Sequence, residues 1–484
     1  MAIEFDLVLR NGRVIDGSGS PSVHADVAVS GDKIVAIDDI PAGSGKTELD
    51  ISGRAVAPGF IDAHTHDDRA LLSAPDMPAK ASQGVTTVIT GNCGISLAPL
   101  SLNQDPPPPL DLIGDRDWYK FPTFGGYLDA LDANPPALNA ACLVGHSTLR
   151  VGAMDDLGRA ANDAELAAMR DQFQKALDDG AIGLSSGTYY PPSAAAPTEE
   201  VAALAELAGA AGGVYATHMR DETDHVMDSI NESIEIAETG GVPLIISHHK
   251  VAGKGNHGRT LETLPLIQDA MNRHDIGLDV YPYVAASSIL NAKRVTQAER
   301  VLIAWSTAAP EMAGRDLADI ARDWGVAEAE AVQRLNPAGA VYFLMSEDDV
   351  RRVLQFPHTM VGSDGLPHDS HPHPRLWGAF PRVLGHYARD VGLFSLEEAV
   401  RRMTSLTADR FGLTGRGRIA PGTFADLVVF DPETVADRAT FETPAVPAAG
   451  IDFVFVNGQI IWRDGASTGA RPGRALRRQK QAIN

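Results

Sequence analysis

The chain has 484 residues, of which 44% are hydrophobic and 21% are charged, as in an ordinary globular protein. Its 41 Lys and Arg against 63 Asp and Glu give a net charge of −22. This acidity disfavours nucleic-acid binding and docking on an anionic membrane, because both need a basic face. We see no secretory signal and no apolar run of membrane-spanning length, and the two cysteines make no disulfide framework. A cytoplasmic protein is therefore predicted.

Short alternating strands separated by turns are predicted at both ends of the chain. Residues 5–9 alternate before the turn Asn11-Gly12, and residues 453–456 lead into the turn Asn457-Gly458. Because the termini of a domain often lie close together, the economical arrangement is one small β-sandwich domain built from residues 1–57 and 415–484. The alternative is two separate hairpin appendages.

Between these ends, apolar strands alternate with helical stretches such as 163–179 and 198–211. Eight strands are predicted, at 59–64, 85–91, 138–145, 181–185, 213–217, 242–248, 276–281 and 358–363. This alternation favours the α/β class and a (β/α)8 barrel over residues 58–414. Such barrels place their chemistry at the C-terminal ends of the strands.

Two stretches are too long for simple crossovers. Residues 98–127, with consecutive prolines at 106–109, are interpreted as a long loop after the second strand. Residues 284–350 lie between the seventh and eighth strands and contain helical patterns near 295–335. Because long insertions in compact domains are usually functional, this segment is predicted to be a lid subdomain over the barrel mouth.

Histidines and an aspartate end several predicted strands. His64 and His66 follow the first strand as His-x-His, and alternate strand residues share a face, so both can reach one metal. His218, His248 and Asp364 end the fifth, sixth and eighth strands around the same mouth. Imidazole suits zinc, and a catalytic zinc keeps a position open for water. The pattern predicts a metal site, and the alternative is a coincidence of surface histidines.

The two cysteines and the adjacent histidines at 248 and 249 differ in whether they are expected to face the site. A lone cysteine is most often a small buried hydrophobe, which is our interpretation of Cys142. Cys93, however, follows the second strand at the mouth, and thiolate is a good zinc ligand. In the sixth strand, the large apolar residues share the parity of His248 and Lys250, which suggests that these two face inward and His249 does not.

Five motifs together resemble those of the amidohydrolase superfamily and, within it, the D-aminoacylases, which are N-acyl-D-amino-acid deacylases. They are GNCGIS (91–96), THMRDE (217–222), ISHHK (246–250), VGSDGLPHD (361–369) and HPHPRLWG (371–378), and the resemblance covers essentially the whole chain. It implies one tightly bound zinc on Cys93, His218 and His248, and a second, weaker site on His64 and His66. The fourth strand (183–187) lacks the lysine that bridges two metals in many amidohydrolases.

The resemblance also implies the reaction, which is zinc-dependent hydrolysis of N-acyl-D-amino acids. Asp364 would carry the proton between water and the leaving amine; the alternative is that it is another ligand or a turn residue. Lys250, Tyr281 and Arg375 would bind the α-carboxylate of the substrate, Arg375 most strongly because a guanidinium matches a carboxylate bidentately. The histidines and prolines of 367–374 are interpreted as a stiff loop that positions Arg375, and His146 faces the site without an assigned role.

The sequence leaves two possibilities for the side chain of the substrate, acidic or hydrophobic. In deacylases for acidic residues, an arginine of the inserted segment meets the side-chain carboxylate, and Arg294 is placed for that role, which favours N-acyl-D-glutamate. The alternative is a hydrophobic N-acyl-D-amino acid, with Lys293 and Arg294 an exposed basic pair at a helix start. Two rival functions are a cyclic-amide hydrolase of the dihydroorotase or hydantoinase type and a non-catalytic scaffold. The missing lysine disfavours the first, and the complete set of ligands disfavours the second.

Overall fold

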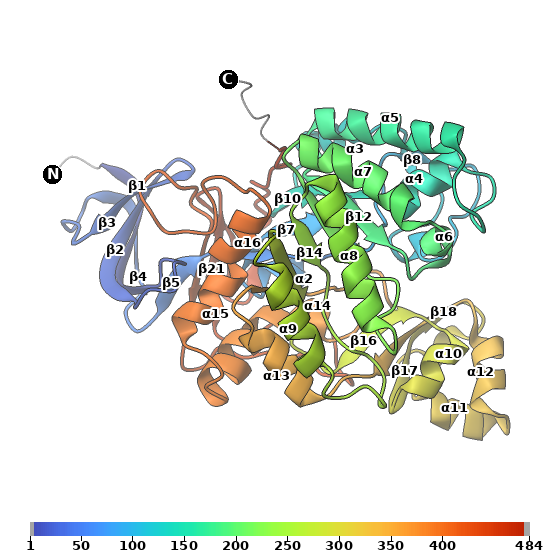
Figure 1. Ribbon diagram of the computed structural model, residues 1–484. Coiled ribbons are helices and arrows are strands. Elements are labelled where there is room, and N and C mark those ends of the chain that lie inside the picture. The colour runs from blue at the N-terminus through green and yellow to red at the C-terminus, as the bar shows by residue number, and fades with distance from the viewer. Residues whose placement is uncertain (1–3, 479–484) are drawn as a thin grey trace.

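Eight parallel strands close into a barrel in the computed structural model, which describes residues 4–478 (Figure 1). In order around the ring they are β6 (Phe60–Asp62), β7 (Val85–Thr90), β10 (Asn139–Cys142) continued by β11 (Val144–Gly145), β12 (Gly183–Gly187), β13 (Val214–His218), β14 (Leu244–Ile246), β15 (Ile276–Val280) and β19 (Thr359–Val361). The ring closes where the amide of Ala63 donates to the carbonyl of Val361, at 3.2 Å. The predicted (β/α)8 barrel and its eight strands are confirmed.

The two faces of the barrel strands belong to different cores. One face fills the barrel with a buried apolar cluster that includes Ile61, Ala63, Ile89, Ala141, Val214, Ala216, Ile245 and Met360. The other face packs in a larger core with the surrounding helices. Helices of this outer layer include α5 (Asp163–Asp179), α7 (Thr198–Ala210), α8 (Val226–Gly240), α9 (Thr260–Ala270), α13 (Glu347–Gln355) and α15 (Leu396–Met403) (Figure 1).

Helix α5 shows how local sequence sets these elements. Asn162 caps its start, because the Asn162 side chain accepts the amide of Glu165 at 3.0 Å and the Glu165 carboxylate accepts the amide of Asn162 at 2.9 Å. Phe173 and Leu177 lie on its buried face. The helix stops at Gly180, whose φ of 113° suits glycine. The predicted helix over 163–179 is confirmed.

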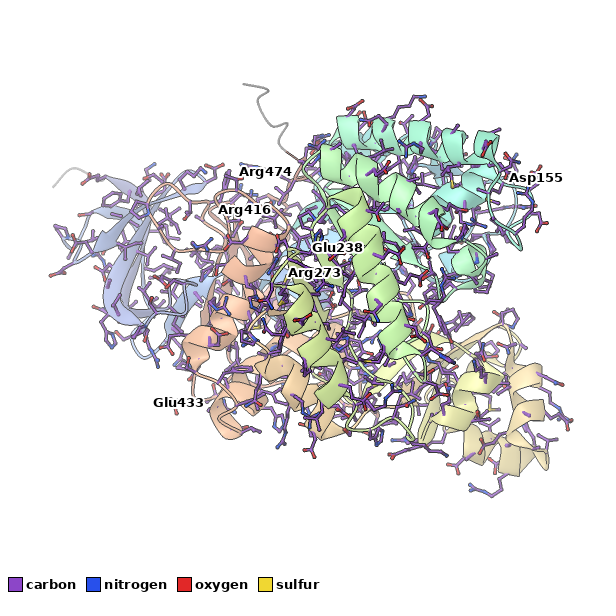
Figure 2. All side chains as sticks on the ribbon, viewed as in Figure 1. Asp155, Glu238, Arg273, Arg416, Glu433 and Arg474 are labelled. Carbon is purple, nitrogen blue, oxygen red and sulfur yellow. The ribbon has the colours of Figure 1, made fainter. Side chains whose placement is uncertain are left out.

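Further helices fill the connections between the barrel strands. They are α1 (Ala70–Ser73), α2 (Pro78–Ala81), α3 (Phe124–Ala133), α4 (His146–Ala153), α6 (Pro191–Ala194), α14 (Arg375–Arg382) and α16 (Ser405–Arg410). Polar contacts join neighbouring outer helices; Figure 2 shows Arg273, just beyond α9, beside Glu238 of α8, and its Nε donates to the Glu238 carboxylate at 2.7 Å. Residues 98–127, interpreted as a loop, also contain the two-residue strands β8 (Leu100–Ser101) and β9 (Lys120–Phe121).

Strands from both ends of the chain form one sheet beside the barrel (Figure 1). Its order is β23 (Ala466–Ser467), β22 (Gln459–Arg463), β21 (Ile451–Val456), β20 (Leu427–Phe430), β5 (Ala55–Pro58), β1 (Phe5–Val14), β2 (Val23–Ser30) and β3 (Lys33–Asp38), with β4 (Gly45–Asp50) also paired to β1. The antiparallel pair of β5 and β20 joins the two ends of the chain. Buried residues of both arms, such as Leu9, Val27, Leu427 and Phe455, share one core.

The segment between β15 and β19 forms a separate small sheet, seen in yellow at the lower right of Figure 1. It contains β16 (Ala285–Ile289), α10 (Ala292–Gln297), β17 (Arg300–Ser306), α11 (Leu317–Trp324), α12 (Glu328–Leu335) and β18 (Ala338–Phe343), with strand order β16-β18-β17. The predicted helical patterns near 295–335 are right for three helices but miss β17, an apolar run that pairs antiparallel with β18.

Within residues 4–478, none of the helices combines the length and the apolar character that a membrane crossing requires.

Candidate active site

The predicted metal ligands meet at the carboxyl ends of the barrel strands. The buried residues of this mouth are His64 and His66 after β6, Cys93 after β7, His218 at the end of β13, His248 after β14 and Asp364 after β19. Together with Lys250, Tyr281 and Arg294, all of them except His64 line one cavity. Ala286, Ser287 and Ser288, which belong to β16 of the inserted segment, line it as well.

Two overlapping groups of side chains have the spacing of metal ligands. One is His64, His66, Cys93 and Asp364, the other is Cys93, His218 and His248, and within each group the ligand atoms lie within 4.8 Å of one another. The Sγ atom of Cys93 lies 3.2 Å from His64 Nε2 and 3.4 Å from His248 Nε2. Cys93 is thus common to both groups and stands between them.

The backbone turns sharply at three of these residues. Cys93 (φ 54°), His248 (φ 37°) and Asp364 (φ 48°) adopt the left-handed conformation, which few residues other than glycine adopt. Such strain persists only where the surrounding structure enforces it, and it gathers at functional sites. Here it aims three strand-end side chains into one cavity.

The same turn corrects our parity argument for the sixth strand. Leu244 and Ile246, which share the parity of His248, pack outward against the helices, whereas Ile245 fills the barrel. Strict alternation would therefore turn His248 away from the mouth. The inward placement of His248 is as predicted, but the positive φ at that residue produces it, not the alternation.

Burial and neighbouring charges fix the ionisation of this group. Burial raises the pKa of the Cys93 thiol, but His64 and His248 outweigh it and hold that pKa well below its usual value of 9.0. Burial lowers the pKa of His218, which favours the neutral ring. The thiolate and the neutral His218 ring are forms that bind metal. At His64 and His248, burial lowers the pKa but the Cys93 thiolate and neighbouring carboxylates outweigh it, so the pKa of both rings is raised.

Asp364 contacts a predicted metal ligand, His66, and a predicted substrate-binding residue, Arg375. One carboxylate oxygen lies 3.2 Å from His66 Nε2 and the other lies 2.9 Å from Arg375 Nη1, while its amide donates to the carbonyl of His64 at 2.8 Å. Burial raises the pKa of Asp364, but Arg375 and His64 outweigh that effect and hold the pKa well below its usual value of 3.8. Asp364 is therefore an ionised carboxylate inside the cavity.

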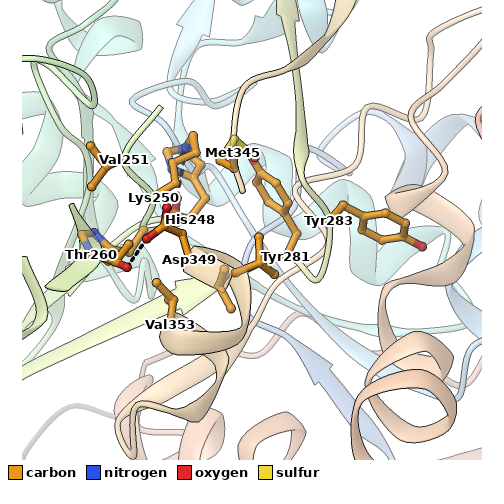
Figure 3. A pocket seen from close by; sticks show the side chains of 12 residues that line it. His248, Lys250, Val251, Thr260, Tyr281, Tyr283, Met345, Asp349 and Val353 are labelled. Carbon is orange, nitrogen blue, oxygen red and sulfur yellow. Dashed lines mark hydrogen bonds between the residues drawn. The ribbon is translucent and has the colours of Figure 1, made fainter. Parts of the chain in front are cut away.

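Three side chains beside Asp364 could hold an anion. Arg375 begins α14 and is 1% exposed, and its guanidinium lies 4.3 Å from the ring centre of Tyr281. Lys250 Nζ lies 5.7 Å from the same ring. Within residues 4–478, Arg375 Nη1 contacts Asp364 as an ion pair, whereas Arg375 Nε and Nη2 and the Tyr281 hydroxyl have no hydrogen-bond partner. Lys250 and Tyr281 also line a second, mostly apolar cavity together with Met345 and Val353, as Figure 3 shows.

Two buried carboxylates of the site were missed by the sequence analysis. Glu222 accepts Lys250 Nζ at 2.6 Å and lies 3.0 Å from His248 Nδ1. Asp279 accepts the amide of His248 at 2.9 Å and lies 3.4 Å from His64 Nδ1. Carboxylates behind ligand imidazoles orient the rings. The available signals were an acid four residues after His218 and an acid inside the apolar strand 276–280.

Arg294 is buried and Lys293 is exposed, so the two are not an exposed pair. The Arg294 guanidinium lies 5.2 Å from the ring of Tyr189 and 5.6 Å from that of Tyr342. Its nearest acid is Glu222, at 3.7 Å. Glu222 is thus the ion-pair partner that a buried guanidinium needs, and Arg294 also lines the cavity, where its charge can act on a bound anion.

The remaining histidines have other partners. His249 points away to Thr263, at 2.9 Å, and His146 pairs with Glu200 at 3.0 Å. His373 accepts the amide of Arg375 at 2.9 Å, so the proline-rich loop does contact the start of α14. Burial raises the pKa of Cys142 to about 12, which fits its interpretation as a core residue.

A (β/α)8 barrel whose strand ends carry these imidazole, thiol and carboxylate groups has the architecture of the amidohydrolases. The model of the Amidohydrolase family matches residues 47–276 and 274–462 of this chain. A D-aminoacylase from Alcaligenes xylosoxydans xylosoxydans is 57% identical over 474 residues, which cover 98% of this chain and 98% of that protein. The chain belongs to the D-aminoacylase family of amidohydrolases.

Solved structures agree with this assignment. A D-aminoacylase with a binuclear metal centre, described by one-metal activation and second-metal attenuation, has a TM-score of 0.96 at 55% identity, covering 98% of this chain and 100% of that chain. An N-acyl-D-glutamate deacylase from Bordetella bronchiseptica, in complex with zinc and a phosphonate mimic of the tetrahedral intermediate, has a TM-score of 0.95 at 44% identity, covering 98% and 100%.

Proposed function

We propose that this chain hydrolyses the amide bond of N-acyl-D-amino acids with zinc as cofactor, releasing a carboxylate and a free D-amino acid. The observation that carries the proposal is the buried group of Cys93, His218 and His248 beside the Asp364–Arg375 pair. The related D-aminoacylase and the zinc-containing deacylase support the substrate class and the metal.

The residues of the site fit a zinc ion. One thiol and two imidazoles are preferred zinc ligands, and three protein ligands leave one position open. Both ring nitrogens of His218 are buried without a hydrogen-bond partner among residues 4–478, so a ring nitrogen is free to serve as a metal ligand. Cys93, His218 and His248 would hold the tight ion, and His64 and His66 a second, weaker one. When bound, zinc polarises the amide carbonyl and lowers the pKa of water towards about 7.

Asp364 would move the proton. As an ionised carboxylate facing the cavity, it can accept a proton from the attacking water. The same oxygen can then return the proton to the leaving nitrogen, which departs as an amine. Arg375 and His66, at 2.9 and 3.2 Å, keep the carboxylate ionised and aimed.

Arg375, Lys250 and Tyr281 would bind the α-carboxylate of the substrate. Within residues 4–478, Arg375 Nε and Nη2 and the Tyr281 hydroxyl are buried donors without a partner, so an incoming carboxylate can accept from them while Arg375 Nη1 stays on Asp364. Lys250 already donates to Glu222, so its contribution to substrate binding is its positive charge and not an unused hydrogen-bond donor. Arg375 is therefore the main anchor, and it links substrate position to Asp364 directly.

A panel of N-acetyl-D- and N-acetyl-L-amino acids, assayed together with zinc content, tests the proposed function. We expect the D series to be hydrolysed, the L series to be left intact, and chelation to abolish turnover until zinc is restored. Hydrolysis of dihydroorotate or a hydantoin instead would favour a cyclic-amide hydrolase. Absence of both zinc and amidase activity would favour a non-catalytic scaffold.

We further propose that Arg294 meets the side chain of the substrate and favours N-acyl-D-glutamate. Arg294→Ala is then expected to lower kcat/KM for N-acetyl-D-glutamate by about 30-fold, as loss of a charge-assisted contact does, and to leave N-acetyl-D-leucine within about threefold. Kinetics with both substrates measure this, and Lys293→Ala is the matched control. If both substrates respond equally, Arg294 does not select the side chain, and the hydrophobic preference would stand.

The division of the chain and its location remain proposals as well. We propose a β domain of residues 1–57 and 415–484, a barrel of residues 58–414 and a lid of residues 284–350 that closes over substrate. A cytoplasmic location stays a prediction from the sequence.

A further inference from the structure

A fully buried lysine lies behind the site, outside the cavity and outside every role described above. Lys80, on α2, has no exposed surface. Its ammonium donates to Asp62 Oδ2 at 2.7 Å and to Ser363 Oγ at 2.5 Å, and it lies 3.3 Å from Asp67 Oδ2. Burying one ammonium with two carboxylates is expensive and does little for stability compared with apolar packing. The cluster therefore points to a role other than stability.

The place of this cluster in the chain suggests that role. Ser363 immediately precedes Asp364, Asp67 immediately follows His66, and Asp62 lies two residues before His64. Lys80 thus holds the chain beside His64, His66 and Asp364, which are three of the four residues in the group that also contains Cys93. Its partners are not adjacent in sequence to His218 or His248.

The cluster also joins the first and eighth strands through the backbone. Asp62 Oδ1 accepts the amides of Ser363 at 2.8 Å and His64 at 3.3 Å. Ser363 Oγ accepts the amide of Gly365 at 3.3 Å, which brackets the left-handed turn at Asp364 from both sides. A strained turn keeps its shape only when its surroundings hold it, and here the side chains that hold it, Asp62 and Ser363, are both bonded to Lys80.

We infer that Lys80 is a positioning residue, which through Asp62, Ser363 and Asp67 sets the placement of Asp364 relative to His64 and His66. It touches neither substrate nor metal. Its removal should misplace the proton shuttle and the weaker metal position together, while the Cys93, His218 and His248 group stays intact. The kinetic part of this inference rests on the proposed function, whereas the metal-binding part does not.

Ser363→Ala and Lys80→Met in the full-length protein test the inference. Each variant, loaded with one equivalent of zinc, is titrated calorimetrically with a second equivalent, and kcat and KM are measured with N-acetyl-D-amino acids. We expect second-metal affinity and kcat to fall by about tenfold in Ser363→Ala and up to about 100-fold in Lys80→Met, as for other supporting residues of metal sites. KM should stay within about twofold and the first zinc should stay bound.

Ser405→Ala is the matched control, because Ser405 is equally buried and donates to the carbonyl of Gly17 at 2.6 Å, far from the site. A folded Ser363→Ala protein with wild-type kcat and wild-type second-metal affinity would overturn the inference, even if Lys80→Met fails to fold. A fall in thermal stability alone, matched by the control, would also overturn it. If the wild type hydrolyses no N-acyl-D-amino acid, the proposed function fails, and the metal titration still decides the inference.

Discussion

Replacement of Asp364 by Asn is expected to lower kcat by about 10³-fold, within the range that a general acid–base group supplies, while one zinc per chain remains bound. Asparagine keeps the size of the side chain but cannot accept the proton of the attacking water. The metal should remain because Cys93, His218 and His248 form a group that does not include Asp364. Steady-state kinetics and metal analysis on the same sample measure both quantities.

The three interpretations of Asp364, as proton carrier, metal ligand or turn residue, predict different results in this experiment. If Asp364 were chiefly a ligand of the tight ion, Asp364→Asn would lose zinc and activity in parallel, and added zinc would restore activity. If it were only a turn residue, activity would remain near normal. Asp426→Asn is a suitable control, because Asp426 is a similarly buried carboxylate whose partners, Arg416 and Asn457, do not line the site.

The sequence was sufficient to predict which residues gather at the mouth, because a parallel barrel has only one place for its strand ends. Any His, Cys or Asp that ends a strand must lie on that rim. This topological rule needs no detailed geometry, so it holds for His218 on β13 as well as for Cys93 beyond β7. The resemblance of the five motifs to those of the D-aminoacylases then indicated which reaction these residues carry out.

Orientation within the rim could not be predicted in the same way. Alternation works only while the chain stays in a strand, and β14 ends at Ile246, two residues before His248. The left-handed turn that aims His248 is enforced by contacts from other elements, including the Asp279 carboxylate on its amide. Such contacts are long-range, so a local pattern does not reveal them.

Supporting charges were the least predictable part of the site. Asp279 and Lys80 are isolated charges in the sequence and Glu222 lies in the charged run 220–224, so the default interpretation of each is a solvated surface group. Their burial appears only after folding brings each beside an opposite charge or a ligand ring. The strand β17 was missed for a related reason, since a short apolar run does not distinguish strand from helix.

The overall charge of the protein limits how it can bind an anionic substrate. At −22, the protein as a whole repels an N-acyl amino acid carboxylate, and salt screens such long-range fields beyond about 8–10 Å. Attraction must therefore be local. The buried cations Arg375, Lys250 and Arg294 supply it, and low exposure makes each charge count for more than it would at the surface.

The strongest of these contacts should be the one made by Arg375, and Arg375→Lys should lower kcat/KM by about 100-fold even though the charge is kept. A lysine ammonium cannot present two parallel donors to a carboxylate, and it cannot stack over Tyr281 as the guanidinium does at 4.3 Å. Because Arg375 also contacts Asp364, part of the loss should appear in kcat and the rest in KM.

Arg382→Lys separates this anchoring role from a general need for arginine on α14. Arg382 lies on the same helix, its guanidinium lies 5.0 Å from the ring of Tyr283, and its acid partner is Asp437 at 3.2 Å rather than a residue of the site. We expect Arg382→Lys to keep kcat/KM within about threefold of the wild type. Equal losses in the two variants would mean that α14 packing governs the effect, and an unchanged kcat/KM in Arg375→Lys would remove Arg375 as the carboxylate anchor.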